Sequence, residues 1–373
     1  MSGIPSIKAI GTAVPPHRIS QEHHYTILES ANGLNRAEKL QLRKIYSHSG
    51  IITRHSVLEE FGHNDRIGNI LFHPAGIEPP ASVSKRMDLY ELYAADLCVK
   101  AVENCLEKVS SFQMNEITHL VTFSCTGMFA PGLDIQLVEK LGLNRNVERT
   151  CINFMGCYAG INALKVAYHI SRSQPGAVVL VAGVELCTIH YKKNNKQDQL
   201  IANAIFADGA SACIVSSKNI SPPSGSVELL LQNFYAEFEP SGKDEMVWRI
   251  GDFGFDLRLS VYVPDLIKRN ILSLMNKLFL KANMKQEKID LYAIHPGGTK
   301  ILVACEEALN ITKEQNRISY EILRDFGNMS SVTIFFVLDK YIQSLTSADR
   351  GKKILACAFG PGLTMESMIV EVS

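Results

Sequence analysis

The order of strand and helix patterns in the first half of the chain recurs in the second half. A strand at 147–152 precedes a helix from Cys157 and then the strands VVLVAG and SACIVSS. A strand ending at His295 precedes a helix beginning after Asn328 and then the strands ILACAFG and ESMIVEV. Such alternation is typical of α/β proteins, so the periodicity alone leaves an ordinary α/β layout open. Two halves related by pseudo-symmetry would instead bring both helix starts to a shared centre.

The chain has 373 residues, which is long enough for two packed halves. We place the boundary at the loose stretch ending at residue 226, which gives an N-terminal half 1–226 and a C-terminal half 227–373. Apolar residues make up 46% of the chain and charged residues 20%, so a folded protein is expected. Because Lys+Arg and Asp+Glu are equal at 38 each, no net charge attracts nucleic acid or an anionic membrane.

The nine cysteines are an odd number and contain no C-x-x-C pair, so neither a disulfide framework nor a metal site is expected. The first ten residues lack the apolar core of a signal peptide. The most apolar run, Ala177–Val184, is far too short to span a membrane. We therefore expect a cytoplasmic protein with reduced thiols.

Cys157 lies in FMGCYAG, between a predicted strand and a predicted helix. The small residues around it allow a sharp turn. The positive end of the helix dipole is expected to lower the pKa of a thiol in this place and so favour a nucleophilic thiolate. The alternative is a buried small hydrophobic residue, the usual role of a cysteine in an α/β core.

His295 and Asn328 lie at two further ends of predicted elements. His295 ends a strand in YAIHPGGTK and would favour the thiolate of Cys157, but a loop histidine without a role fits the same position. Asn328, in FGNMSS, fits a helix N-cap equally well. A carboxamide beside an imidazole would donate hydrogen bonds to a developing oxyanion or enolate.

Taken together, the motifs resemble those of the type III polyketide synthases, the chalcone and stilbene synthase family of the thiolase superfamily. The resemblance covers the chain beyond about residue 115, and the first hundred residues match only loosely. The segments are THLVTFSCTG at 118–127, PGLDIQLVEKLGL at 131–143, MGCYAGINALKVA at 155–167, AIFADGASACIV at 204–215, VPDLI at 263–267, IHPGGTKIL at 294–302, GNMSSVTIFFVLDK at 327–340 and FGPGLTMESMIV at 359–370.

The resemblance implies a thiolase-like α/β fold, in which duplicated βαβαβαββ halves form a five-layered αβαβα core. It implies that Cys157 accepts an acyl group from a starter acyl-CoA. His295 and Asn328 would stabilise the enolate formed when malonyl-CoA loses carbon dioxide. Repeated Claisen condensation and cyclisation would then give a pyrone or phenolic product. No metal or cofactor beyond the CoA thioesters is implied, and a homodimer is expected.

The resemblance also implies a gated cavity. Phe206 matches the aromatic gate, with a core phenylalanine as the alternative, and Leu257 stands where the family has a second phenylalanine. Trp248 falls near a glycine of the chalcone-forming members, and a larger ring there would shrink the cavity. A chalcone-type product is therefore not carried over. The remaining predicted cavity residues are Cys187 and His190, in place of threonines, together with Ser330 and Pro361.

The phosphates of CoA call for basic residues at the mouth of the cavity. Arg43, Lys44 and Arg54 fall in the region where the family binds these phosphates, and Lys300 follows the His-Pro-Gly-Gly motif. Each of the four, taken singly, fits a solvated surface charge as well.

Three other functions remain open. A β-ketoacyl-acyl-carrier-protein synthase shares the Cys/His/Asn set, but His-Pro-Gly-Gly replaces its usual His-Gln-Ala-Asn. A cysteine hydrolase of the papain type fits the spacing between Cys157 and His295 but needs a Cys-Gly-Ser-Cys-Trp context that the chain lacks. A binding protein without activity leaves the three motifs unexplained.

Overall fold

The computed structural model describes residues 3–31, 33–61, 81–109, 112–192, 196–220 and 226–373. Within these residues nine strands join into one sheet in the order β11-β12-β13-β8-β1-β7-β6-β4-β5. The two halves meet where β1 pairs with β8, through Ser6 opposite Leu230 and Ile7 opposite Leu229. The division at residue 226 stays a prediction, and residues 221–225 before it lie outside the described part.

The first half contributes five strands and three long helices to this arrangement. Parallel pairing joins β4 to β5 and to β6, whereas β7 is antiparallel to both β6 and β1. Every residue of β6 and β7 is buried, as expected for strands covered on both faces. The elements are β1 (Ser6–Ala13), α3 (Val83–Leu106), β4 (His119–Ser124), α4 (Leu133–Leu141), β5 (Glu148–Asn153), α5 (Ala159–Ser173), β6 (Val178–Leu186) and β7 (Asp208–Ser216).

The second half follows a similar order, but α9 stands in the place of β5, so this half contributes four strands to the sheet. Here β11 is parallel to β12, and β13 is antiparallel to both β12 and β8. The elements are β8 (Leu229–Phe238), α7 (Val263–Lys281), β11 (Leu291–Ile294), α8 (Thr299–Leu309), α9 (Arg317–Phe326), α10 (Thr333–Ser344), β12 (Lys353–Gly360) and β13 (Thr364–Val372).

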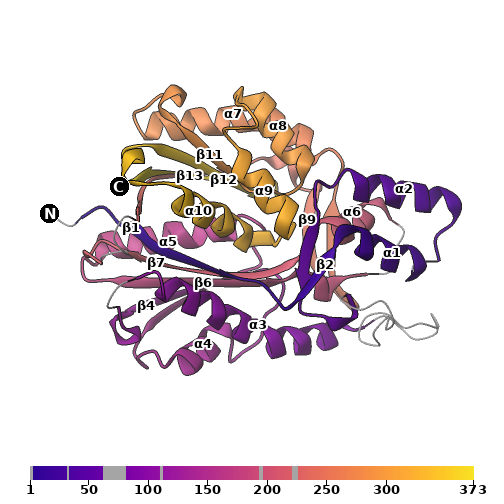
Figure 1. Cartoon of the computed structure of the whole chain (residues 1–373), viewed down its shortest axis with the longest axis horizontal. Helices are drawn as coiled ribbons and strands as arrows, with labels where there is room; N and C mark the ends of the chain where they lie inside the picture. Colours follow the sequence, from indigo (N-terminus) through magenta and orange to yellow (C-terminus); the bar gives the residue numbers. More distant parts are fainter. Residues whose placement is uncertain (1–2, 32, 62–80, 110–111, 193–195, 221–225) are drawn as a thin grey trace.

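Figure 1 shows these elements stacked in layers, with α7 and α8 above the strands of the second half and α3 and α4 below those of the first. Between the two groups of strands lie α5 and α10, whose apolar faces pack together in the largest buried cluster, where Phe123 stacks on Phe335 at 5.3 Å between ring centroids. The predicted thiolase-like α/β fold is therefore confirmed. It places the starts of both central helices in the interior.

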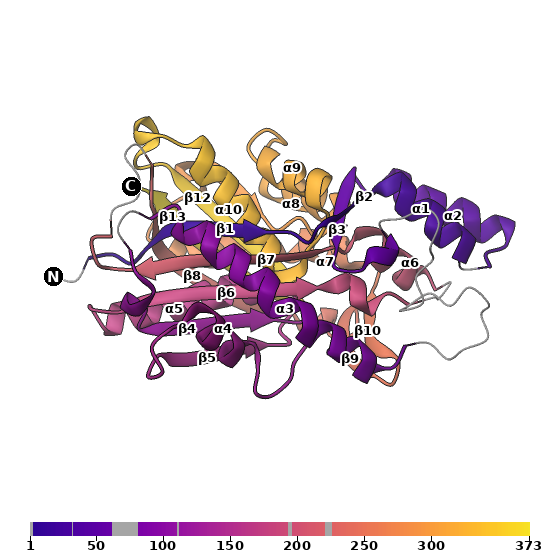
Figure 2. The same cartoon turned by 60° about the horizontal axis from the view of Figure 1, so that its bottom comes forward.

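A smaller group of elements lies at the end of the molecule away from both termini (Figures 1 and 2). They are β2 (His17–Ser20), α1 (Gln21–Ala31), α2 (Arg36–Ser47), β3 (Thr53–Ser56), α6 (Gln197–Ile205) and the hairpin of β9 (Met246–Gly251) and β10 (Gly254–Leu259). No helix among the described residues is long and apolar enough to cross a membrane.

Candidate active site

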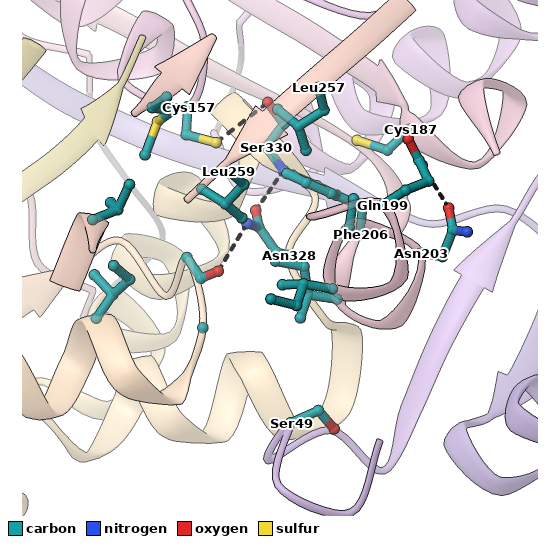
Figure 3. A pocket seen from close by; sticks show the side chains of 18 of the residues that line it. Ser49, Cys157, Cys187, Gln199, Asn203, Phe206, Leu257, Leu259, Asn328 and Ser330 are labelled. Carbon is teal, nitrogen blue, oxygen red and sulfur yellow. Dashed lines mark hydrogen bonds between the residues drawn. The ribbon is translucent and has the colours of Figure 1, made fainter. Parts of the chain in front are cut away.

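Cys157 lies in the turn that leads from β5 into α5. Gly156 has φ +89°, and a Cβ there would lie 2.2 Å from Cδ of Pro361, so only glycine fits. Pro361, in the turn between β12 and β13, therefore packs directly behind the turn that carries Cys157. The Sγ atom of Cys157 lies 3.6 Å from Oγ of Ser330, which begins the short 3-10 helix η6 (Ser330–Val332) (Figure 3).

The amide of Asn328 has one defined orientation. The backbone N–H of Ser330 donates to Oδ1 of Asn328 at 2.8 Å, and a backbone N–H can only donate. Nδ2 must therefore point the other way, where it lies 3.3 Å from the carbonyl oxygen of Gly297 (Figure 3). Asn328 thus presents a donor, rather than an acceptor, toward the loop after His295.

His295 directly follows β11, and its backbone N–H donates to the carbonyl of Cys357 at 2.8 Å. The residue is 1% exposed, and neither Nδ1 nor Nε2 has a hydrogen-bond partner in the described part of the chain. Buried polar groups without partners are rare in folded proteins and are often kept for chemistry. A neutral imidazole always carries one N–H donor and one acceptor nitrogen.

One cavity of about 610 Å³ brings these residues together. Figure 3 shows Cys157 at one end of the view and Ser49 at the other, with Phe206 and Asn328 between them. The predicted site residues that line the cavity are Cys157, His295, Asn328, Phe206, Leu257, Trp248, Cys187, His190, Ser330, Pro361, Lys44 and Lys300.

Burial governs the protonation of the two reactive groups. It raises the pKa of Cys157 to about 12, with the Ser330 hydroxyl acting in the opposite direction, and it lowers the pKa of His295 to about 3. Desolvation therefore opposes the expected lowering of the Cys157 thiol pKa by the helix dipole. The resting groups are a neutral thiol and a neutral imidazole, and the imidazole can act as a general base.

The far wall of the cavity is built from aromatic rings. Trp248 donates from Nε1 to the carbonyl of Cys125 at 2.8 Å and meets His190 edge-on at 5.6 Å between ring centroids. Nε2 of His190 lies 2.6 Å from the carbonyl of Thr126, so this nitrogen carries the proton, and Nδ1 accepts from the N–H of Phe255. These contacts fix Trp248 and His190 as rigid walls.

The four predicted phosphate ligands fall in different places. Lys44, on α2, and Lys300, at the start of α8, line the cavity and are exposed. Arg43 is exposed on α2 but does not line the cavity, and its role stays a prediction. The assignment of Arg54 was wrong, because Arg54 is 2% exposed and donates from Nη1 to the carbonyls of Asn203 and Phe206.

Several lining residues were not predicted from the sequence. Cys125 and Thr126 follow directly after β4, and the end of that buried strand is a signal that could have pointed to them. Phe255 and Met246 come from the β9–β10 hairpin, whose alternating pattern was not predicted from the sequence. Among the described residues, no three His, Cys, Asp or Glu side chains gather as metal ligands do.

Comparison with known proteins places this chain in a family. The model of the chalcone and stilbene synthase N-terminal domain matches residues 1–219, and that of the C-terminal domain matches residues 231–373. The chain belongs to the chalcone and stilbene synthase family. Its members include the type III polyketide synthases, which are acyl-transferring condensing enzymes, so the predicted function class is confirmed.

Three similar proteins illustrate the match. The alpha-pyrone synthesis polyketide synthase-like Pks18 of Mycobacterium tuberculosis is 28% identical, over 91% of this chain and 84% of its own. PKS-I from the brown alga Ectocarpus siliculosus superposes with a TM-score of 0.89 at 27% identity, over 100% of this chain and 99% of its own. The structure of CsyB complexed with CoA-SH gives a TM-score of 0.85 at 25% identity, over 99% and 100%.

Proposed function

We propose that this type III polyketide synthase loads a starter acyl group from acyl-CoA onto Cys157 and extends it with malonyl-CoA. The observation that carries the proposal is the pair of donors in the cavity. Asn328 Nδ2 points toward the loop that follows His295, and the imidazole of His295 has no competing partner in the described chain. Two preorganised donors are what a developing enolate oxygen requires.

Loading begins with the proton of Cys157. The imidazole of His295 accepts this proton as Sγ attacks the thioester carbonyl of the acyl-CoA. The C–S bond to CoA breaks, the proton passes to the departing CoA sulfur, and the acyl group stays on Cys157.

Extension follows when malonyl-CoA enters. Its C–C bond to the carboxylate breaks, carbon dioxide leaves, and the electron pair forms an enolate held by the N–H groups of His295 and Asn328. The enolate carbon attacks the acyl carbonyl on Cys157, a C–C bond forms, and the thiolate is released. The Cys157 thiolate then attacks the thioester carbonyl of the extended chain, the C–S bond to CoA breaks, and the departing CoA thiolate takes up a proton from solvent. These steps repeat until cyclisation gives a pyrone or phenolic product. We propose no cofactor beyond the CoA thioesters.

The direct test is incubation of the protein with malonyl-CoA and a panel of short-chain, long-chain and aromatic acyl-CoAs, with products read by mass spectrometry. We expect lactones or phenols that contain the starter and whole malonate-derived units. Release of free acids alone would support a hydrolase and contradict the proposal.

Replacement of Trp248 by Gly is expected to lengthen the main product by at least one extension. Removing the indole opens the wall beside His190 and gives the growing chain more room. Product masses measure the effect, and Trp248→Phe, which keeps most of the ring volume, is the control. An unchanged product profile in Trp248→Gly would show that this wall does not limit the chain.

Replacement of Lys44 by Met is expected to raise the KM for malonyl-CoA about fivefold with little change in kcat. This change corresponds to about 1 kcal/mol, the free energy expected from the loss of one exposed charged contact. Lys44 lines the mouth of the cavity, and its positive charge suits the CoA phosphates. Lys39→Met, on an exposed part of the same helix away from the cavity lining, is the matched control. Equal KM values for the two variants would remove Lys44 from the CoA site.

We propose a homodimer that forms through β5. This strand is at the edge of the sheet, and Glu148, Arg149, Thr150 and Cys151 are exposed along it. A long exposed edge strand is a template for pairing with another chain. Light scattering is expected to give twice the chain mass of 41.3 kDa. A monomer mass at micromolar concentration would contradict it.

We also propose a cytoplasmic setting. All nine cysteines are free thiols, as a reducing compartment leaves them.

A further inference from the structure

Arg54 is a buried cation that has no role in the proposed reaction steps. It lies on β3, is 2% exposed and does not line the cavity. Nη1 donates to the carbonyl oxygens of Asn203 at 2.8 Å and Phe206 at 2.7 Å, whereas Nε and Nη2 have no hydrogen-bond partner among the described residues. Burying a guanidinium is costly, so its position calls for a reason.

The two carbonyls that Arg54 binds belong to the C-terminal end of α6, where Phe206 is the C-cap residue. The last carbonyls of a helix have no partner within the helix, and a cation there also complements the helix dipole. Arg54 therefore fixes the end of α6 and the backbone of Phe206, which lines the cavity (Figure 3).

The backbone around Phe206 is in turn bonded to Asn328. The N–H of Asn328 donates to the carbonyl of Ile205 at 2.9 Å, and the N–H of Ala207 donates to the carbonyl of Asn328 at 2.9 Å. Gly327, with φ +72°, lies against Arg54 on the other side, because a Cβ there would be 2.9 Å from its Cγ. The two hydrogen bonds form a short ladder between residues 205–207 and Asn328. Arg54 contacts the segments on both sides of this ladder.

A buried acid anchors the other end of the same strand region. Asp208 is fully buried and accepts from the N–H of Val57 at 2.9 Å and from the N–H and hydroxyl of Thr188 at 2.8 and 2.6 Å. Burial raises the pKa of Asp208 to about 6, whereas the hydrogen bonds from Thr188 and Val57 and the charge of Arg54 act to lower it. Residues 54–57 are therefore tied to residues 203–208 at two points, which limits sliding of α6 relative to β3.

We propose that Arg54 is a positioning residue for the decarboxylation step. It holds the end of α6 and, through the ladder between residues 205–207 and Asn328, keeps the Asn328 amide in the direction that the enolate requires. This inference rests on the proposed function of Asn328. An arginine that bound CoA phosphate would instead need an exposed guanidinium.

The test is a double-mutant cycle between Arg54→Lys and Asn328→Ala. Lysine keeps the charge but lacks the planar fork that spans two carbonyls. We expect Arg54→Lys to lower kcat for malonyl-CoA decarboxylation about tenfold, while KM and the rate of acyl loading change less than about twofold. In the Asn328→Ala background, Arg54→Lys is expected to have less than about a twofold effect, because both changes remove the same donor geometry.

Additive effects of Arg54→Lys and Asn328→Ala on decarboxylation would overturn the proposal. A rise in the KM of Arg54→Lys like that expected for Lys44→Met would also overturn it. So would equal losses of acyl loading and decarboxylation in Arg54→Lys. If Arg54→Lys does not fold, Gly327→Ala takes its place, since it keeps the charge and presses on Cγ of Arg54 and the carbonyl of Ile205. Normal decarboxylation in Gly327→Ala would then overturn the proposal. A wild-type protein that never decarboxylates malonyl-CoA would refute the proposed function itself, whereas normal activity in Arg54→Lys refutes only this inference.

Discussion

Replacement of Cys157 by Ala is expected to abolish both transfer of acyl groups to the protein and formation of extended products. Sγ of Cys157, the proposed nucleophile, lies in the cavity beside the Ser330 hydroxyl, at the start of a central helix. Without it no covalent acyl intermediate forms, and the loss should exceed about a thousandfold. Radiolabelled acyl-CoA, followed by separation of the protein, measures the transfer.

Cys187→Ala is the matched control, because its thiol lines the same cavity but lies in the short helix Cys187–His190. This variant is expected to load acyl groups at close to the wild-type level. Malonyl-CoA decarboxylation should persist in Cys157→Ala, since His295 and Asn328 are unchanged. Loading of Cys157→Ala at the wild-type level would end the assignment of the nucleophile.

Replacement of Asn328 by Ala is expected to slow malonyl-CoA decarboxylation by about 10²–10³-fold, which corresponds to about 3–4 kcal/mol of lost transition-state stabilisation. Nδ2 is the donor aimed away from Ser330, so the enolate loses one of its two hydrogen bonds. Acyl loading depends on Cys157 and His295 and should change little. Release of carbon dioxide from labelled malonyl-CoA measures the first rate, and acyl transfer measures the second.

Asn328→Asp separates the donor from the packing of the side chain. The carboxylate keeps the shape and still accepts the N–H of Ser330, but it has no N–H to offer. We expect a loss at least as large as that of Asn328→Ala. Full decarboxylation by Asn328→Asp would mean that the amide has a structural role only.

The fold followed from the sequence wherever the apolar periodicity was strong. The predicted strand at 147–152 is shifted by one residue from β5 (Glu148–Asn153), and the helix predicted to begin at Cys157 begins two residues later as α5. The β9–β10 hairpin was missed, because its residues are only partly buried and face a cavity on one side. Strand residues that face a cavity alternate less clearly between apolar and polar types than strand residues that face a packed core.

The site could be predicted in part because its reactive residues lie at the ends of strands and helices, in recognisable motifs. The protonation states of these residues could not be predicted, because the pKa of a thiol depends on desolvation by residues that are distant in the sequence. The assignment of Arg54 to the CoA phosphates was wrong for the same reason. A basic residue near other basic residues suggests a phosphate site. Only the tertiary structure shows that the guanidinium of Arg54 donates to the last carbonyls of α6.

We propose that Cys157 carries the growing chain between condensations. The most direct test is to mix the wild-type protein with a starter acyl-CoA and malonyl-CoA, quench the reaction, digest the protein and analyse the peptide that contains Cys157 by mass spectrometry. We predict the starter acyl group on Cys157 before malonyl-CoA is added, and the same group grown by whole ketide units afterwards. An unmodified Cys157 together with acyl groups on another residue, or free acid as the only product, would contradict the account.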